Sequence, residues 1–473
     1  MGALPGALED LGHDTTVILP RYRHTQFSSL SGVEGSGAVA RTGRLRQAGR
    51  DRDVIWHTLT ISPRRRVVFV DVPEYYDRAG LYTERGIDYP DNAARFDMLA
   101  VAALDYARVE LPDTDIVHAH DWQASLALVR LATESRWGTL HRAGRILTIH
   151  NLFYQGVFPR ETVPALGLPW DAFGMDVGEF WGQFNFLKAG INTADFVTTV
   201  SPTYAKETLT PAIGVGLDGV LRARGERYIG ILNGIDTTVW NPETDPYLTS
   251  HFSVNDLSGK AACKRQLLAE FGLPQGDDAI ERPLVGLVSR LVAQKGLDQI
   301  QRAGRDLVAL DAGFVFLGEG DAKYEDALRR LAAAFPARVA ARIGFNERLA
   351  HLVEAGADIF LMPSEFEPCG LNQMYSLRYG TVPIVRAVGG LHDTIQPYTA
   401  RAQYANGFKF RDATADALVR ITQQAIRLYH NPAAWRKLVE NGMTADHSWR
   451  ASALEYGKVY RRARAVGAAR GAA

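Results

Sequence analysis

The 473-residue sequence has little cysteine, with only Cys263 and Cys369. Two cysteines in a chain of this length do not make a disulfide framework, so we expect a reducing, cytoplasmic location. No apolar run reaches the roughly 20 residues that a membrane-spanning helix needs. The residues after Met1 show neither the basic segment nor the apolar segment of a signal peptide. These absences argue against a disulfide-rich secreted fold and against a membrane protein.

The sequence also lacks an excess of charge, since 53 Lys and Arg balance 53 Asp and Glu. This balance gives no argument for a nucleic acid or an anionic membrane as partner, although it leaves room for a local basic site for phosphates. Hydrophobic residues make up 46% and charged residues 22%, which is typical of a soluble globular protein. The length exceeds one ordinary core and predicts at least two domains.

Short apolar strands alternate with helices in two series, separated by a polar, proline-containing stretch at 237–246. Such alternation predicts an α/β protein with two doubly wound, Rossmann-like parallel sheets facing a cleft. We expect an N-terminal domain at 1–238, a C-terminal domain at 239–449, and a final helix within 450–473 that packs back on the first domain. The expected strands are 15–19, 54–61, 67–70, 115–119, 145–149, 195–200 and 229–232, then 283–288, 314–317, 339–343, 359–362 and 382–385.

Histidines follow two of the expected strands. On a strand, His118 and His120 share a face, and His150 ends the next strand. An HxH pair can supply two ligands of a metal site, which keeps a metal-dependent hydrolase as an alternative. Such a site needs further ligands. The histidines could also be structural. We favour polar recognition of a substrate at the strand ends.

Two positive side chains, Arg290 and Lys295, project from one short loop between a strand and a helix that starts near Gly296. A guanidinium binds a diphosphate bidentately, an ammonium adds a point charge, and the helix start favours an anion. The loop therefore predicts a diphosphate site. The alternative is a solvated surface loop.

A second loop, at 363–371, joins an expected strand to a helix at 372–379. Glu367 can accept hydrogen bonds from sugar hydroxyls, and Gly370 lets the backbone approach a ligand closely. Cys369 has no neighbouring histidine to activate it, so we expect a small buried residue there. The Gly389-Gly390 turn predicts another backbone loop near the ligand.

Aromatic residues are frequent in the expected loops of the first series. Their rings could line an extended glucan groove, although we expect no more than half of them to contact sugar, because most large aromatics belong to the core. They are Tyr75, Tyr76, Tyr82, Tyr89, Trp122, Tyr154, Phe180, Trp181, Phe184 and Phe186.

Over nearly its whole length the sequence resembles the bacterial glycogen synthases and plastid starch synthases. The combination of EPCGLNQ, SRLxxQKG and ILNGID is highly specific for that family. The motifs, in order, are HAHDW, TIHNL with YQG, NFLKAG, TVSPTYA, ILNGID, SRLVAQKG, EPCGLNQMYSLRYGT and GGLHDT.

The resemblance implies a GT-B fold, with the second domain binding the nucleotide sugar. It also implies retaining transfer of glucose from ADP-glucose to the non-reducing end of an α-1,4-glucan, without a metal or other cofactor. Arg290 and Lys295 would hold the diphosphate, Glu367 the glucose hydroxyls, and His150 the reacting face. The remaining substrate-binding residues that we assign are Asp121, Trp122, Tyr154, Asn233, Cys369, Gly370, Leu371 and Gly390.

One departure from the family pattern lies at the N-terminus. Family members begin with a strand and a Lys-x-Gly-Gly-Leu loop, just upstream of a segment like Gly2-Ala3-Leu4-Pro5. We therefore expect a first domain truncated at its N-terminus. The alternative function is a catalytically impaired glucan-binding or regulatory protein. UDP-glucose is the alternative donor.

Overall fold

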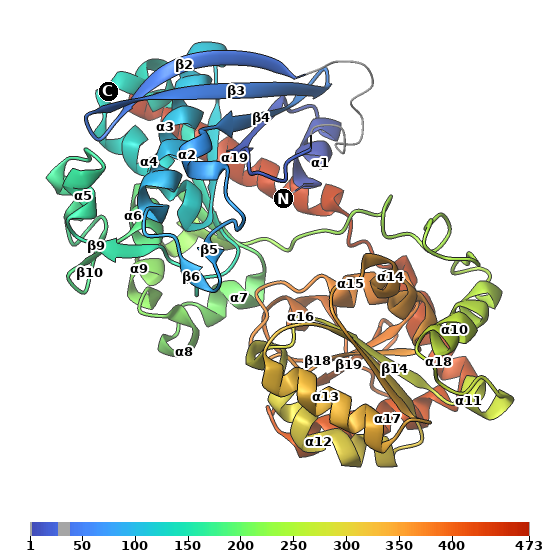
Figure 1. The fold of residues 1–473 in the computed structure, drawn as a ribbon. Coiled ribbons are helices and arrows are strands. Elements are labelled where there is room, and N and C mark those ends of the chain that lie inside the picture. The colour runs from blue at the N-terminus through green and yellow to red at the C-terminus, as the bar shows by residue number, and fades with distance from the viewer. Residues whose placement is uncertain (1, 27–37, 473) are drawn as a thin grey trace. The chain divides into compact units, whose positions relative to one another are not determined.

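A computed structural model describes residues 2–26 and 38–472 as two compact units (Figure 1). Unit 1 comprises Met1–Val200, Ala205–Ile231 and Trp449–Ala473, and unit 2 comprises Ser201–Tyr204 and Leu232–Ser448. The chain passes into unit 2 at Leu232 and back at Trp449, compared with the predicted steps at 238/239 and 449/450. The four-residue segment of unit 2 at Ser201–Tyr204 was not expected from the strand and helix pattern.

The described part of unit 1 has two four-stranded sheets. The first, ordered β1-β4-β3-β2, is mixed, and the second, ordered β13-β12-β8-β7, is wholly parallel. All seven strands predicted for the first series are present. The first sheet consists of β1 (Thr15–Pro20), β2 (Val39–Gln47), β3 (Arg50–Ser62) and β4 (Arg65–Asp71), and the second of β7 (Ile116–His120), β8 (Gly144–Ile149), β12 (Phe196–Thr199) and β13 (Tyr228–Gly230).

The first sheet departs from the expected parallel pattern at the β2–β3 hairpin. Its turn residues, Ala48 and Gly49, both have positive φ, at 51° and 77°. This backbone suits a two-residue hairpin, whose twist matches that of the strands. β2 and β3 therefore pair antiparallel, without a crossover helix.

Helices α4 and α6 pack together in unit 1, and the long C-terminal helix α19 packs on β8 and α1. Every residue of β8 is buried, as expected of a central parallel strand. Two small antiparallel sheets complete the unit: β5 (Thr83–Glu84) with β6 (Ile87–Asp88), and β9 (Val157–Pro159) with β11 (Gln183–Asn185) and β10 (Glu179–Phe180). The helices are α1 (Leu4–Asp10), α2 (Pro73–Tyr76), α3 (Asn92–Glu110), α4 (Asp121–Thr133), α5 (Thr162–Ala165), α6 (Phe186–Thr193), α8 (Pro211–Gly214), α9 (Asp218–Ala223) and α19 (Trp449–Ala472), with 3-10 turns η2 (Ser135–Arg142), η3 (Trp170–Phe173) and η4 (Gly225–Arg227). Helix α7 (Pro202–Glu207) is divided between the two units after Tyr204.

Unit 2 is built on a six-stranded parallel sheet of order β16-β15-β14-β17-β18-β19. Strands β14, β15 and β16 follow one another towards one edge of the sheet, and strands β17, β18 and β19 follow one another towards the opposite edge. The switch point of this doubly wound sheet therefore lies between β14 and β17, where ligands gather outside the carboxyl ends of the strands. The strands are β14 (Leu284–Val288), β15 (Gly313–Gly318), β16 (Val339–Ile343), β17 (Ile359–Met362), β18 (Val382–Arg386) and β19 (Phe408–Phe410).

Helices cover both faces of this sheet, with α12, α13 and α17 side by side on one face and α14 and α15 on the other (Figure 1). The segments that lead into and out of unit 2 are paired, because Ile235 N donates to His447 O at 2.8 Å. The helices are α10 (Ser258–Glu270), α11 (Asp277–Glu281), α12 (Leu297–Ala309), α13 (Ala322–Ala334), α14 (Glu347–Gly356), α15 (Asn372–Arg378), α16 (Gly389–Thr394), α17 (Ala415–Tyr429) and α18 (Pro432–Thr444), with the 3-10 turn η5 (Ala293–Lys295).

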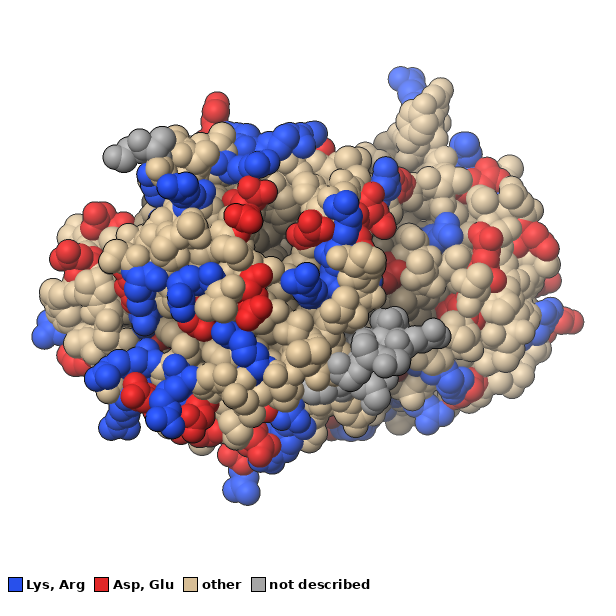
Figure 2. All heavy atoms as spheres, turned by 90° about the horizontal axis from the view of Figure 1, so that it is seen from above, with Lys and Arg blue, Asp and Glu red and all other residues tan. Residues whose placement is uncertain are grey.

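The surface carries both signs of charge. On the face drawn in Figure 2, Lys and Arg are interspersed with Asp and Glu. Within the described residues, no helix is both long enough and apolar enough to cross a bilayer.

Candidate active site

The loops after β14 and β17 meet in unit 2. The two strands are neighbours, with Gly286 opposite Phe360. Gly296, at the end of the first loop, has a φ of 77°, and a Cβ there would lie 2.0 Å from the Pro363 carbonyl oxygen. A residue larger than glycine would therefore separate the loops. This close approach brings together the two motifs that the sequence predicted to act on a sugar diphosphate.

An ion pair joins these loops. Lys295 Nζ lies 2.5 Å from Glu367 Oε2, and Ser364 Oγ donates to the same oxygen at 3.1 Å. The Glu367 side chain is 8% exposed and that of Lys295 is 19% exposed. The carboxylate is thus held by two partners in a partly desolvated place, where charged hydrogen bonds are strong.

Arg290 lies exposed beside this pair. Among the described residues, its guanidinium makes a weak hydrogen bond of 3.4 Å from Nη2 to Gln294 Oε1. Gln294 itself ties the loops together, because its carbonyl accepts from Glu365 N at 2.8 Å. Most of the guanidinium donors therefore remain available to a ligand.

The predicted glycine turn packs against the Glu367 loop. Gly390 N donates to Glu367 O at 3.2 Å, and a Cβ on Gly390 would lie 2.1 Å from Cys369 O. Gly370, at a φ of 71°, and the partly exposed Leu371 precede α15. Cys369, Gly370, Leu371 and Gly390 thus lie with Glu367 around the carboxyl end of β17.

Cys369 and Asn233 adjoin in the same place. Burial raises the pKa of the Cys369 thiol to about 12, and a hydrogen bond with the Asn233 backbone opposes that rise. The thiol is therefore protonated at neutral pH and is no nucleophile. The Asn233 side-chain oxygen is buried and has no hydrogen-bond partner in the described residues, so it can accept from a ligand hydroxyl.

In unit 1 the predicted histidines form one chain of contacts. His118 and His120 stack at 4.2 Å between ring centroids, and His120 Nδ1 lies 3.0 Å from His150 Nε2. Asp121, which has a φ of 55°, accepts from His150 N at 2.7 Å. A non-glycine residue at positive φ is strained, and such strain is common at functional sites.

Burial shapes the charge of this cluster. Desolvation lowers the pKa of His118 to about 3, with a contribution from His150, and holds the pKa of His120 well below its usual value. Desolvation also lowers the pKa of His150 and raises that of Asp121. The three imidazoles are therefore neutral at pH 7.

The HxH pair is not arranged as a metal site. His118 Nδ1 lies 3.0 Å from the Tyr460 hydroxyl, and its Nε2 lies 2.6 Å from Thr148 Oγ1. Across residues 2–26 and 38–472, no group of three or more His, Cys, Asp or Glu side chains is placed to hold a metal ion. The contacts of His118 fit a structural role, one of the readings that the sequence left open.

The predicted aromatic residues divide into core and surface. Trp122 is 9% exposed and packs edge-on to Phe96, at 4.9 Å between centroids, so little of its ring is open to a sugar. Tyr154 is 57% exposed. Tyr82 and Trp181 are also exposed, Tyr89 and Phe180 are partly buried, and Tyr75, Tyr76, Phe184 and Phe186 are buried.

Sequence reasoning missed several residues that position the site. Ser364 supports Glu367, and Asp393 in α16 accepts from Thr203 N at 2.9 Å and from Thr203 Oγ1 at 2.5 Å. The second contact draws the Ser201–Tyr204 segment into unit 2. Both residues stand inside recognised motifs, but their partners are set by packing rather than by spacing.

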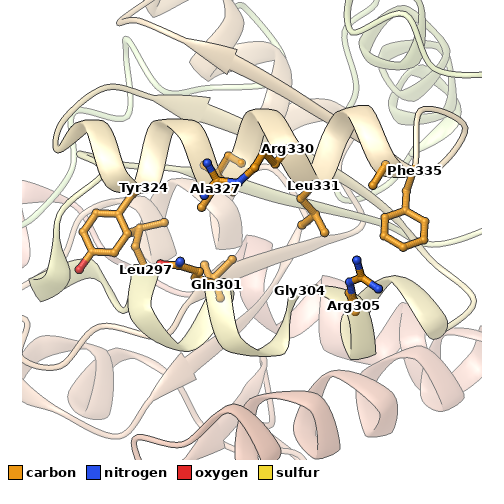
Figure 3. Close-up of a pocket in the computed structure, with 12 residues that line it drawn as sticks. Leu297, Gln301, Gly304, Arg305, Tyr324, Ala327, Arg330, Leu331 and Phe335 are labelled. Atoms are coloured by element: carbon orange, nitrogen blue, oxygen red, sulfur yellow. The ribbon is translucent and has the colours of Figure 1, made fainter.

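Figure 3 shows a groove of about 270 Å³ between α12 and α13. Its floor is largely apolar, and Arg305 and Arg330 lie along it. None of the predicted site residues lines this groove. The groove is therefore separate from the ion-paired loops, although α12 follows one of them.

Comparisons with known proteins agree with this arrangement. The family described as the starch synthase catalytic domain matches residues 1–223, and the glycosyl transferases group 1 family matches residues 276–442. The glycogen synthase of Anaeromyxobacter dehalogenans (strain 2CP-C) is 47% identical over 463 residues, which are 97% of this chain and 94% of that protein. The glycogen synthase of Koribacter versatilis (strain Ellin345) is 44% identical over 98% of this chain and 94% of its own length.

A solved structure extends the likeness to three dimensions. The catalytic domain of starch synthase IV from Arabidopsis thaliana, bound to ADP and acarbose, has a TM-score of 0.87 at 32% identity and covers 98% of this chain and 94% of its own. The GT-B fold expected from the sequence is confirmed. None of these relatives supports the alternative of a non-catalytic protein. The chain belongs to the glycogen and starch synthase family of glycosyltransferases.

Proposed function

We propose that this chain transfers glucose from ADP-glucose to the non-reducing end of an α-1,4-glucan, with retention at the anomeric carbon. The relatives are glycogen synthases, and the Arabidopsis structure contains ADP and acarbose. The observation that carries the proposal is the Lys295–Glu367 ion pair at the switch point of unit 2, with Arg290 exposed on the same loop as Lys295 and weakly hydrogen-bonded to Gln294. The two buried, unpaired cysteines suit a cytoplasmic enzyme.

Arg290 and Lys295 hold the donor diphosphate in this proposal. The guanidinium of Arg290 binds phosphate oxygens bidentately, and Lys295 lies between the diphosphate and Glu367. Negative charge on the diphosphate grows as the bond to glucose breaks. Both side chains therefore stabilise the transition state more than the bound donor and raise the turnover.

The glucosyl group is held by polar groups around the end of β17. Glu367 accepts from its hydroxyls, the amides of Gly370 and Leu371 donate, and the Asn233 side-chain oxygen offers the acceptor that lacks a partner in the protein. Gly390 keeps the backbone close to the ligand. Cys369 contributes its small buried volume rather than its thiol chemistry.

In unit 1 we assign His150, Asp121 and Tyr154 to the substrate. Asp121 fixes the His150 backbone through its 2.7 Å hydrogen bond, and we assign the His150 carbonyl to the developing positive charge at the anomeric carbon. A neutral imidazole adds no repulsion to that charge. The acceptor hydroxyl then attacks from the face that the diphosphate leaves, so no carboxylate nucleophile is required.

The main test replaces Arg290. Arg290→Ala should lower the turnover number by about 100-fold or more, as loss of one preorganised electrostatic donor does. The readout is the initial rate of glucose transfer from ADP-glucose to glycogen. Arg302→Ala, which removes an exposed arginine from α12, is the matched control and should be near normal. A near-normal rate in Arg290→Ala would refute the role of Arg290.

A panel of nucleotide-sugar donors tests which nucleotide base the enzyme prefers. We expect ADP-glucose to be used with a higher kcat/KM than UDP-glucose, since the matched solved structure contains ADP. The same panel on a chain extended upstream by a relative's Lys-x-Gly-Gly-Leu loop measures what that loop contributes. Absence of transfer in both chains, with every donor, would rule out the enzyme function.

A further inference from the structure

The β10–β11 hairpin of unit 1 exposes a tryptophan at its tip. Trp181 is 83% exposed and is followed by Gly182, and these two residues have φ values of 53° and 79°. Glu179 Oε1 accepts from Gly182 N at 2.8 Å, and this hydrogen bond stabilises the turn. The hairpin therefore presents a whole indole ring to solvent on a fixed two-residue turn.

This placement is unfavourable for folding in two respects. A turn with positive φ at both central residues prefers Asn-Gly, and a bulky side chain at positive φ is a genuine outlier. An exposed indole also gains nothing from burial. The backbone suits a two-residue hairpin, as at Ala48-Gly49, but a bulky, exposed ring at this position is a candidate for ligand binding.

Contacts connect the hairpin with the loop that carries His150. A Cβ on Gly216 would lie 3.0 Å from Phe180 Cζ and 3.8 Å from Trp181 Nε1, so this glycine allows the 215–216 turn to lie against the hairpin tip. Gln155 Nε2 donates to the Val215 carbonyl at 3.0 Å.

The same glutamine fixes the other side of the hairpin, because its Oε1 accepts from Asn185 Nδ2 at 2.6 Å. Gln155 directly follows the exposed Tyr154, which is assigned to the substrate. The indole thus belongs to the same part of unit 1 as the proposed acceptor residues.

The surroundings favour a sugar over a protein partner. Gly182 and Gln183 are exposed next to the ring, and Glu179 is polar. A stable protein interface needs about 800 Å² on each partner with an apolar core, which the turn residues around the ring do not supply by themselves. One flat ring beside an amide suits a glucose unit, whose C–H face stacks while its hydroxyls hydrogen bond.

We propose that Trp181 is a binding subsite for an internal glucose unit of the acceptor α-glucan, away from its reacting end. This proposal rests on the proposed function and extends it to long acceptors. Stacking on the indole would retain a glycogen chain near the site between transfers, whereas a short oligosaccharide would not depend on it.

Trp181→Asn tests the subsite. Asn-Gly is the preferred pair for this turn, so the variant should unfold at an equal or higher temperature than the native chain. Its affinity for glycogen, measured by retardation in a glycogen-containing native gel, should fall about tenfold, as loss of one aromatic contact predicts. KM for glycogen should rise by a larger factor than KM for maltotriose.

Two further variants complete the design. Tyr404→Ala removes an aromatic side chain that is 79% exposed in unit 2 and should leave glycogen retardation unchanged. Trp181→Phe should keep part of the affinity. Unchanged retardation of Trp181→Asn, or a change only in its oligomeric state, would overturn the subsite.

The gel needs no donor, so it decides the subsite even if the chain transfers no glucose. Failure of the native chain to use maltotriose would instead contradict the proposed function.

Discussion

His118 shows how burial fixes the charge of a single residue. Its imidazole lies between two hydroxyl groups, and burial lowers its pKa to about 3. In the unfolded chain a histidine binds a proton below about pH 6.5. The unfolded state therefore binds a proton that the folded state does not bind. The free energy of unfolding consequently decreases as the pH falls from about 6.5 towards 3.

We predict that this histidine makes the fold acid-sensitive. Each such group contributes a slope of up to about 1.4 kcal/mol per pH unit between roughly pH 6 and 4. His118→Gln keeps polar atoms for the two hydroxyls. It should reduce the slope of the unfolding free energy against pH by the contribution of one histidine. Urea unfolding at several pH values, followed by tryptophan fluorescence, measures it. An unaltered slope in His118→Gln would contradict the prediction.

For single residues, the sequence predicted the candidate site residues better than it predicted which aromatic side chains are exposed. Motif spacing placed Arg290, Lys295 and Glu367 in strand-end loops, and the structure brings these loops together. It did not separate Trp122, which packs in the core, from Trp181, which is exposed. Trp122 follows Asp121 and Trp181 follows Phe180, and neither neighbour decides which ring is covered, because burial depends on tertiary contacts.

Gly296 is a point at which two loops of unit 2 approach closely. Its positive φ and the 2.0 Å separation between a built Cβ and Pro363 O leave no room for a side chain. Since Pro363 begins the loop that carries Glu367, the glycine sets the distance between the two proposed diphosphate and glucose loops.

Gly296→Ala should therefore separate the loops and misalign Lys295 with Glu367. We expect kcat/KM for ADP-glucose to fall at least tenfold, with a loss of stability of about 1–2 kcal/mol from the backbone conformation alone. Steady-state kinetics and thermal unfolding report the two effects. Gly276→Ala, where a Cβ meets nothing within 4 Å, should change neither. Native kinetics in Gly296→Ala would show that the loop spacing does not matter.

Elements were predictable where one short segment carried the signal. Apolar runs located β8 and β14, because a strand buried on both faces needs continuous hydrophobic residues. The β2–β3 hairpin was harder, since its Ala48-Gly49 turn lacks the common Asn-Gly signature. The division of unit 1 into two sheets was also beyond local patterns, because strand pairing depends on residues far apart in the sequence.

At the scale of the whole molecule, the end of the chain completes the unit in which it began. Tyr456, Val459 and Ala463 of α19 are buried with Leu4 and Leu8 of α1 in one apolar cluster. An ion pair between Arg470 and Asp195 ties the last turns of α19 to the start of β12. Unit 1 therefore depends on a helix that is synthesised after unit 2.

Deleting residues 449–473 should destabilise unit 1 and leave unit 2 folded. The deletion exposes one face of β8 and α1, whereas unit 2 keeps its sheet and all its strands. Limited proteolysis should then leave a resistant fragment close to 232–448. Removing only 471–473 should have no such effect. Equal resistance of unit 1 in the complete and shortened chains would disprove this dependence.

The hydrogen bond between Ile235 N and His447 O has a consequence for recombination. Because the chain leaves and returns at neighbouring points, 232–448 can be exchanged between relatives through two adjacent junctions, provided that the Ser201–Tyr204 segment, which donates to Asp393, is exchanged with it. A hybrid made this way would inherit its nucleotide preference from one parent and its polysaccharide preference from the other.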